Sequence, residues 1–205
     1  MLAANDEKLS TCALRPSVLF GPGDYQLIPS LHACIAKGET PFVIGSGENL
    51  WDVTYVSNIA DAHVLAVENL LSEKTAAGDA FFISNEEPIT FRDFCLAVWG
   101  NFGHYPPYEV HIPVAFATLA GYIAELVTCI TGNRTMLSRG SVLDACATRY
   151  CSGKKARDIL GYKPKVCIEE GIRISCVVSI EKWVSTLYQT DWTIGLCATL
   201  VDASA

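Results

Sequence analysis

The chain has 205 residues, of which 50% are apolar and 18% are charged, and its formal net charge is −7. This length is sufficient for a domain with a substantial core. The acidic balance and the lack of any basic run exclude the electrostatic footprint of a nucleic-acid-binding protein. The opening residues MLAANDEKLS carry charges where a signal peptide has its apolar region, so we expect a protein that is not secreted.

Apolar spacing and turn residues predict most elements of the chain. In chain order, the expected elements are the tail of a helix at 1–5, a strand at 11–20, a turn at 21–24, a helix at 26–37, two short strands around the Gly-Ser-Gly turn within 41–56, a helix from Ser57 or Asn58 to Leu71, a strand at 79–85, a helix from Thr90 to about Gly100, an extended link at 103–113, one or two helices up to Gly132, a short strand and then a helix within 147–165 that stops at Gly161, and a final helix at 167–188.

Two of these helices have features that bear on later results. Ser57 or Asn58 is expected to cap its helix, with Asp61 in the first turn near the positive end of the helix dipole. The stretch from Ile112 to Gly132 is almost entirely apolar, apart from Glu125. It is interpreted as a buried helix, and a helix lying on or in a membrane is the alternative.

The strands at 11–20 and 79–84 are apolar on both faces and alternate with helices, which predicts an α/β fold with a mostly parallel sheet. Ligands of such sheets bind beyond the carboxyl ends of the strands. The loop Gly21-Pro22-Gly23-Asp24 follows the first strand directly, so we expect it on the ligand-binding side.

Familiar catalytic motifs are absent or incomplete. The glycine pairs at 21–23 and 45–47 each lack the third glycine of a dinucleotide fingerprint, and there is no phosphate-binding P-loop. Tyr150 and Lys154 have the Tyr-x-x-x-Lys spacing of short-chain dehydrogenases. Gly153 interrupts that segment, however, and Ser152 is a better helix cap, so Tyr150 is expected outside the helix and the match is taken as a coincidence.

The nine cysteines form no C-x-x-C pair, and the four histidines have no metal-ligand spacing with them. We therefore expect no metal site. The thiols are interpreted as small apolar core residues in a reducing compartment.

Four segments in order resemble the extended short-chain dehydrogenase/reductases, and more narrowly their 3β-hydroxysteroid dehydrogenase group. They are TCALRPSVLFGPGD (11–24), GSGENLWDVTYVSNIADAHVLA (45–66), FFISNEEPITFRDF (81–94) and KKARDILGYKPKVCIEEGI (154–172). The resemblance implies a Rossmann-like fold with a mostly helical substrate-binding region. Such enzymes oxidise a sterol 3-hydroxyl with NAD or NADP.

In this group the glycine fingerprint and the catalytic Ser, Tyr and Lys precede the segments that match. By resemblance, residues 1–188 are the C-terminal half of such an enzyme, with the fingerprint half absent, and 189–205 are an unmatched tail. No catalytic residue is therefore assigned, and we expect the chain alone to be catalytically incomplete.

The resemblance also implies binding residues. The cofactor would meet Pro16, Ser17 and Val18, and the substrate would meet Gly21, Pro22, Gly23, Asp24, Asn49, Trp51, Asp52 and Tyr55. Sugar-nucleotide relatives have an arginine where Trp51 stands. A tryptophan suits an apolar ring system better than a diphosphate. The resemblance implies a sterol of the 4-carboxysterol type.

Two alternatives to an enzyme half remain open. The chain would be a non-catalytic module that binds a sterol-like molecule between Trp51, Tyr55 and the 112–132 helix, or that pairs with a separate Rossmann half or with a second copy. It would otherwise be a truncated product without a folded role, because half a parallel sheet exposes strand edges. A sterol substrate and the apolar 112–132 stretch make the surface of the endoplasmic reticulum the expected location.

Overall fold

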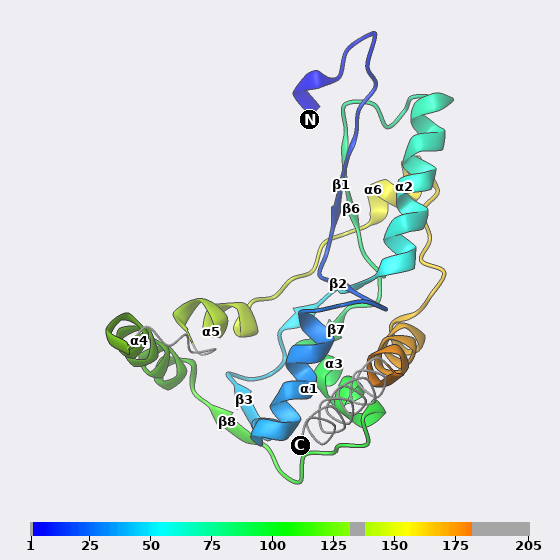
Figure 1. Cartoon of the computed structure of the whole chain (residues 1–205). Helices are drawn as coiled ribbons and strands as arrows, with labels where there is room; N and C mark the ends of the chain where they lie inside the picture. Colours follow the sequence, from blue (N-terminus) through cyan, green and yellow to red (C-terminus); the bar gives the residue numbers. More distant parts are fainter. Residues whose placement is uncertain (1, 132–137, 182–205) are drawn as a thin grey trace, which may run out of the picture.

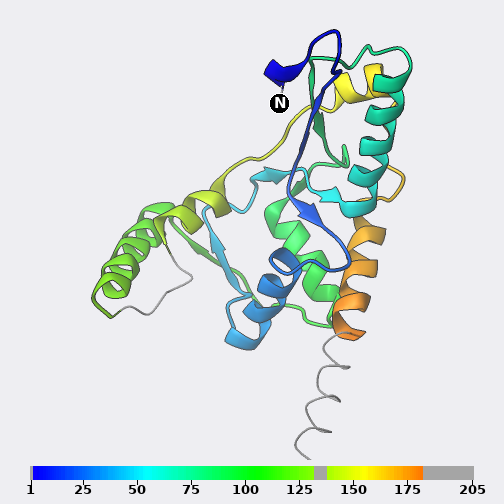
Figure 2. The same ribbon diagram turned by 45° about the horizontal axis from the view of Figure 1, so that its top comes forward.

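The computed structural model describes residues 2–131 and 138–181, which form an elongated α/β assembly (Figures 1 and 2). The elements in order are a 3₁₀ turn at Leu2–Ala4, β1 Ala13–Pro16, β2 Leu19–Phe20, α1 Leu27–Lys37, β3 Phe42–Ile44, β4 Leu50–Trp51, β5 Thr54–Tyr55, α2 Val56–Leu71, β6 Ala80–Ile83, β7 Ile89–Thr90, α3 Phe91–Asn101, β8 Val110–Ile112, α4 Val114–Thr131, α5 Arg139–Cys146 and α6 Lys154–Leu160. Residues 168–181 form a further helix, as expected, while 182–188 and the unmatched tail lie outside the described residues.

One end of the molecule is built on the parallel pair of β1 and β6, which α2 and α6 cover on one face (Figure 1). Leu14 lies opposite Phe81 in this register. Phe81 and Ile83 are fully buried against Ala62 of α2 and Leu160 of α6. The alternate residue Phe82 is 44% exposed, so only one face of this strand pair is covered by the described residues.

A second core lies between α1, α3 and the helix at 168–181. Phe20 packs edge-on against Tyr55 and Phe94, with ring centroids 5.6 Å apart in each pair. Gly171 allows this close packing, because a Cβ there would lie 2.8 Å from a ring carbon of Tyr55. The segment from Leu19 to Tyr55 is thus anchored in a continuous apolar cluster.

The α/β class and the parallel pairing are confirmed, but the single strand expected at 11–20 is wrong. The chain changes partner at Ser17 and Val18. Ser17 N–H still donates to Ile83 of β6 at 3.0 Å, while the carbonyl of Val18 already accepts from Thr54 at 2.8 Å. β1 therefore pairs with β6, and β2 pairs with β5, both in parallel.

The two strands expected around the Gly-Ser-Gly turn do not pair with each other. β3 pairs in parallel with β8, and β4 pairs antiparallel with β7. β8 arises within the link at 103–113, which was expected to be extended without a partner. Its three prolines, at 106, 107 and 113, all lie outside the paired residues, so they cost the ladder no hydrogen bond.

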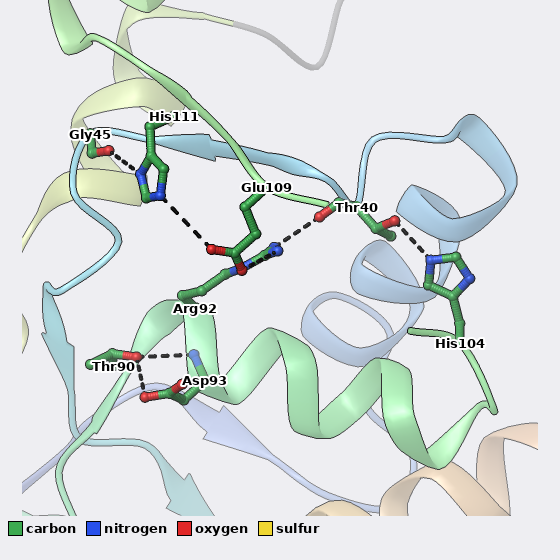
Figure 3. Close-up of polar contacts among 8 residues, drawn as sticks. All are labelled: Thr40, Gly45, Thr90, Arg92, Asp93, His104, Glu109 and His111. Atoms are coloured by element: carbon green, nitrogen blue, oxygen red, sulfur yellow. Dashed lines mark hydrogen bonds and ion pairs between the residues drawn. The ribbon is translucent and has the colours of Figure 1, made fainter. Parts of the chain in front are cut away.

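A polar network fixes the β3–β8 pair to α3 (Figure 3). The Arg92 guanidinium donates to Glu109 at 2.9 Å and to the carbonyl of Thr40 at 2.8 Å. The Thr40 hydroxyl is 2.8 Å from His104, and His111 is 3.1 Å from the carbonyl of Gly45. These contacts compensate for the small size of the two three-residue strands.

Helix caps were predicted correctly only in part. Thr90 caps α3 by accepting from the Asp93 amide at 3.0 Å, as expected (Figure 3). The cap at Ser57 or Asn58 is wrong, because α2 begins at Val56, with Tyr55 as its cap and no acidic residue in its first turn, so the expectation for Asp61 is wrong too.

Asn58 is instead fully buried inside α2. Its side chain donates to Asn85 at 2.9 Å and to the carbonyl of Val166 at 2.8 Å, so it joins three segments. Similarly, Gly153 rather than Ser152 caps α6. Tertiary partners explain the position of Asn58.

The prediction of a buried helix at 112–132 is wrong. α4 and α5 form an arm that projects from the rest of the chain in both views (Figures 1 and 2). Gly121 faces the start of α5 and Ala117 is buried, but Phe116, Ile123 and Ile130 are 69%, 53% and 85% exposed. In the described part of the chain, no helix has both the length and the apolar character needed to cross a membrane.

The cysteine prediction holds for part of the set. Cys95 and Cys176 are buried, and burial raises the pKa of Cys95 to about 12. Cys129, Cys151 and Cys167 are exposed, so they are not core residues.

Candidate functional site

A pocket of about 250 Å³ lies where β1 and β6 end, on the side predicted to bind a ligand. Its lining is shared by three segments, namely Arg15, Pro16 and Ser17, then Phe82, Ile83 and Ser84, and finally Thr148, Arg149, Tyr150 and Cys151. Two arginines and no acidic residue are in this lining. The pocket therefore suits a ligand that is partly apolar and carries a negative charge.

The Gly21–Asp24 loop forms a second, shallower pocket of about 210 Å³ with Val56. Gly21 is required there, because a Cβ at this position would lie 2.4 Å from Val56 Cγ1. The carboxylate of Asp24 accepts hydrogen bonds from the backbone amides of Gln26, Leu27 and Ile28 at 2.7, 3.1 and 2.9 Å. Asp24 thus stabilises the start of α1, and its substrate role stays a prediction.

Asn49 and Trp51 hold the segment that follows α5. The Asn49 amide donates to the carbonyls of Ala145 and Ala147 at 2.9 and 3.2 Å, and the Trp51 indole donates to Ala147 at 3.1 Å. The Trp51 ring also packs against Phe91, with centroids 4.3 Å apart. These two residues therefore position the segment at 148–151, which is the third wall of the pocket at the ends of β1 and β6. We call this pocket the strand-end pocket.

Of the ten residues that line this pocket, only Pro16 and Ser17 were predicted from the sequence as binding residues, and Arg149 is among those that were missed. Its backbone lies between Leu50 and Asp52, donating to Leu50 at 2.7 Å and accepting from Asp52 at 2.9 Å. Its guanidinium lies 5.2 Å from the centre of the Trp51 ring and pairs with Asp144. The backbone pairing of Arg149 with residues almost a hundred positions earlier is not visible in the sequence. The sequence drew attention only to the neighbouring Tyr150.

Asp52 is a buried carboxyl group with 1% relative exposure. Neither of its oxygens has a hydrogen-bond partner of good geometry among the described residues. Burial raises the pKa of Asp52, the negative charges of Glu86 and Glu87 raise it further, and the Ser84 hydroxyl offsets part of this. Asp52 lies beside the pocket residue Arg149 but does not line the pocket.

The cavity expected between Trp51, Tyr55 and the 112–132 helix does not exist in the described structure. Tyr55 is 5% exposed and packs in the core against Phe20, while α4 lies in the projecting arm (Figure 1). A different apolar pocket, of about 180 Å³, is lined mainly by α1, β3 and α3. Trp51 and Tyr55 are not part of its lining.

The Tyr-x-x-x-Lys match is a coincidence of spacing. Tyr150 lies in a non-helical segment, and Lys154 is the first residue of α6. The two side chains therefore do not occupy successive turns of one helix, which the proton transfer in short-chain dehydrogenases requires.

The pocket has room for one end of a dinucleotide and no cradle for its phosphates. The backbone of Pro16 and Ser17 offers a wall for a flat ring. A pyrophosphate needs a glycine-rich turn at a helix N-terminus, and the sequence has no such fingerprint. The lining contains no glycine-rich turn suited to a pyrophosphate, and contact of Pro16 and Ser17 with a nicotinamide ring stays a prediction.

A family model described as the 3-beta hydroxysteroid dehydrogenase/isomerase family matches residues 1–114, more than half of the chain. The chain belongs to this family. The family assignment agrees with the resemblance found in the sequence. The matched residues include the Gly21–Asp24 loop and two of the three segments that line the strand-end pocket, those at 15–17 and 82–84.

Among characterised members of the 3-beta hydroxysteroid dehydrogenase/isomerase family, the sterol-4-alpha-carboxylate 3-dehydrogenase erg26, decarboxylating, of Schizosaccharomyces pombe is 44% identical over 174 residues. The match covers 84% of this chain and 51% of that protein. The corresponding enzymes of Saccharomyces cerevisiae and Mus musculus are 42% and 35% identical, over 51% and 49% of their lengths. The chain thus spans about half the length of the curated relatives it matches.

Solved structures place this family member in the Rossmann-like extended short-chain dehydrogenase fold. The crystal structure of gox2253 matches 88% of this chain and 52% of its own, with a TM-score of 0.61 and 21% identity. A UDP-glucose 4-epimerase from Thermotoga maritima matches with a TM-score of 0.55 and 20% identity, over 88% of this chain and 49% of its own. A dTDP-glucose 4,6-dehydratase of the same fold, from Bacillus anthracis, was crystallised with NAD.

Proposed function

We propose that this chain forms the substrate-side part of an NAD(P)-dependent dehydrogenase that oxidises the 3β-hydroxyl of a 4-carboxysterol in sterol biosynthesis. The observation that carries the proposal is the 44% identity to a sterol-4-alpha-carboxylate 3-dehydrogenase over 84% of the chain. The strand-end pocket supports it, because an apolar pocket with two arginines suits an anionic sterol.

In this proposal the nicotinamide ring of NAD or NADP lies against the backbone of Pro16, Ser17 and Val18. The Gly21–Asp24 loop shapes one side of the reaction pocket, and Trp51 supports another. The cofactor supplies the hydride acceptor when it is bound. The proton of the 3-hydroxyl would be removed by a tyrosine with a lysine beside it, as in the family, and neither role has a candidate in the described residues.

The test is turnover by the purified chain with NAD or NADP and a 4-carboxysterol. We expect no reduced cofactor from the chain alone, and steady production would contradict its catalytic incompleteness. Adding the N-terminal half of the S. pombe relative should restore production, with an unrelated protein of similar size as the control. No production in that mixture would count against the proposed reaction.

A second candidate function is a non-catalytic module that binds a sterol or pairs with a separate Rossmann half. It is favoured by β1, which is paired on one edge alone among the described residues, since a free edge accepts another strand. Thermal-shift titration with sterols in the absence of cofactor discriminates here. The lack of a shift with every sterol would leave sterol binding by this chain without support.

We further propose that the chain associates with a membrane surface, such as that of the endoplasmic reticulum, through α4. The exposed apolar side chains of α4 and the membrane-soluble nature of sterols support this placement. A second copy of the chain is the alternative occupant of the same surface.

A further inference from the structure

We infer that Arg149 binds the carboxylate of the substrate and thereby selects 4-carboxysterols over neutral sterols. This inference rests on the proposed function. In such a substrate the carboxylate is carried by C4, and the hydroxyl to be oxidised is on the neighbouring C3. The group that binds the carboxylate must therefore lie beside the position from which the hydride leaves.

The strand-end pocket meets this condition. Pro16 and Ser17, the residues proposed to face the nicotinamide, line the same pocket of about 250 Å³ as Arg149. Phe82, which is 44% exposed, supplies apolar surface in the same pocket. A sterol ring placed on that surface would have C3 toward the cofactor side and its C4 substituent within reach of the third wall.

The arginine is held in place before any ligand arrives. Its backbone is bonded on both sides, to Leu50 and Asp52, and its guanidinium lies against the ring of Trp51. Trp51 is itself 7% exposed and fixed by its bond to Ala147. Because little side-chain freedom remains to be lost, a bidentate carboxylate contact is favourable here.

Arg149 keeps donors for a ligand. Its contact with Asp144 uses Nη2, and the Asp144 carboxylate is 69% exposed. Exposed ion pairs of this kind contribute little to stability, and guanidinium has five N–H donors. A substrate carboxylate can therefore bind beside Asp144 or displace it.

Arg15 is the other cation of the pocket and the competing candidate. Its guanidinium lies over the ring of Phe82, at 5.9 Å, on the open face of the β1–β6 pair. Its backbone is also fixed, opposite Phe82 in the β1–β6 pair, but Phe82 is 44% exposed, whereas the Trp51 under the Arg149 guanidinium is 7% exposed. The geometry therefore favours Arg149 as the carboxylate partner.

The test is equilibrium binding of a 4α-carboxysterol and of a neutral 4α-methylsterol, measured by calorimetry on the full chain and on four variants, R149Q, R149K, R15Q and R157Q. We expect the chain to prefer the carboxysterol about tenfold or more, as a charge-assisted hydrogen bond in a partly buried site provides. R149Q should lose this preference and keep its affinity for the neutral sterol, while R149K should retain part of it. R157Q, which removes an arginine outside the pocket, is the matched control and should keep the full preference.

Each other outcome has a definite meaning. If both sterols bind equally to the unsubstituted chain, the inference is overturned and the proposed function stands. If R149Q keeps the preference and R15Q loses it, the carboxylate belongs to Arg15. If R149Q also loses the neutral sterol, Arg149 acts through the fold and the inference fails. If no sterol binds at all, sterol recognition by this chain fails together with the inference.

Discussion

Single side chains near the strand ends fix neighbouring backbone segments through hydrogen bonds that are not evident from their positions in the sequence. Asp24 accepts hydrogen bonds from three backbone amides, and Asn49 donates to the carbonyl of Ala145 at the end of α5 and to that of Ala147 just after it. Asp52 is the exception, because its carboxylate is buried and neither oxygen makes a hydrogen bond of good geometry with the described residues. Such a group lowers stability when it is ionised.

Replacing Asp52 with Asn should stabilise the chain at pH 7, by an amount on the order of 1 kcal/mol. The pKa of Asp52 is raised in the folded state, so the native protein binds more protons than the unfolded chain between the two pKa values. The loss of folding stability caused by the ionised carboxylate is therefore complete above the folded-state pKa. It disappears at pH values below the ordinary carboxyl pKa. We expect the advantage of D52N in urea unfolding to shrink as the pH falls from 7 toward about 4.

The exposed Asp158 provides the control, since D158N should change the free energy of unfolding little at either pH. An advantage of D52N that stays constant across this pH range would show that Asp52 is not the titrating group.

At the scale of elements, close helix packing is the decisive feature of the projecting arm. Gly121 of α4 lies directly against the start of α5, where a Cβ would be 2.9 Å from the carbonyl carbon of Ser138. Glu125 accepts from the backbone and guanidinium of Arg139 at 2.9 and 3.0 Å. These hydrogen bonds hold the pKa of Glu125 below its usual value, and the one from the Arg139 backbone has the largest effect.

G121A should separate α4 from α5 and lower stability by about 1–3 kcal/mol, because the clash is with backbone that cannot rotate away. Hydrogen exchange of the α5 amides, together with thermal unfolding, would measure this loss. G140A is the matched control, since its Cβ would meet only Ser138 Oγ at 3.6 Å. Alanine there should stabilise α5 by up to about 1 kcal/mol, and equal effects of the two variants would contradict the packing argument.

At the scale of the whole molecule, exposed apolar side chains are concentrated on α4. Eight large apolar side chains of α4 are exposed, namely Val114, Phe116, Leu119, Tyr122, Ile123, Leu126, Val127 and Ile130. Contiguous apolar surface of this kind marks a contact with a membrane or another protein. Since the net charge is −7, attraction to anionic lipid is not expected to drive such a contact.

The chain should therefore bind zwitterionic vesicles in a manner that is insensitive to salt. The double variant L119K/I130K should weaken co-sedimentation with such vesicles about tenfold or more, because two apolar groups would be replaced by charges at the lipid boundary. V67K, a change of similar exposure on α2, is the control and should leave vesicle binding unchanged. Retained binding in the double variant would exclude α4 as the contact.

The sequence by itself determined the local and compositional features of this protein. Apolar runs and alternation with helices indicated the α/β class, Thr90 indicated its cap, and four ordered motifs indicated the family. These features depend on residues close together in the chain, and their physics is visible in a short window. The binding roles of Pro16 to Asp24 and of Asn49 to Tyr55 stay predictions.

Tertiary structure alone decided how distant segments meet. The break between β1 and β2 depends on which strand lies beside each half, and the burial of Asn58 depends on loops about 30 and 110 residues away. An apolar helix was expected to be buried, yet whether α4 has a covering partner is not encoded in its own residues. A backbone bridge to Trp51 places Arg149 at the strand-end pocket, and no local sequence pattern predicts such a long-range pairing.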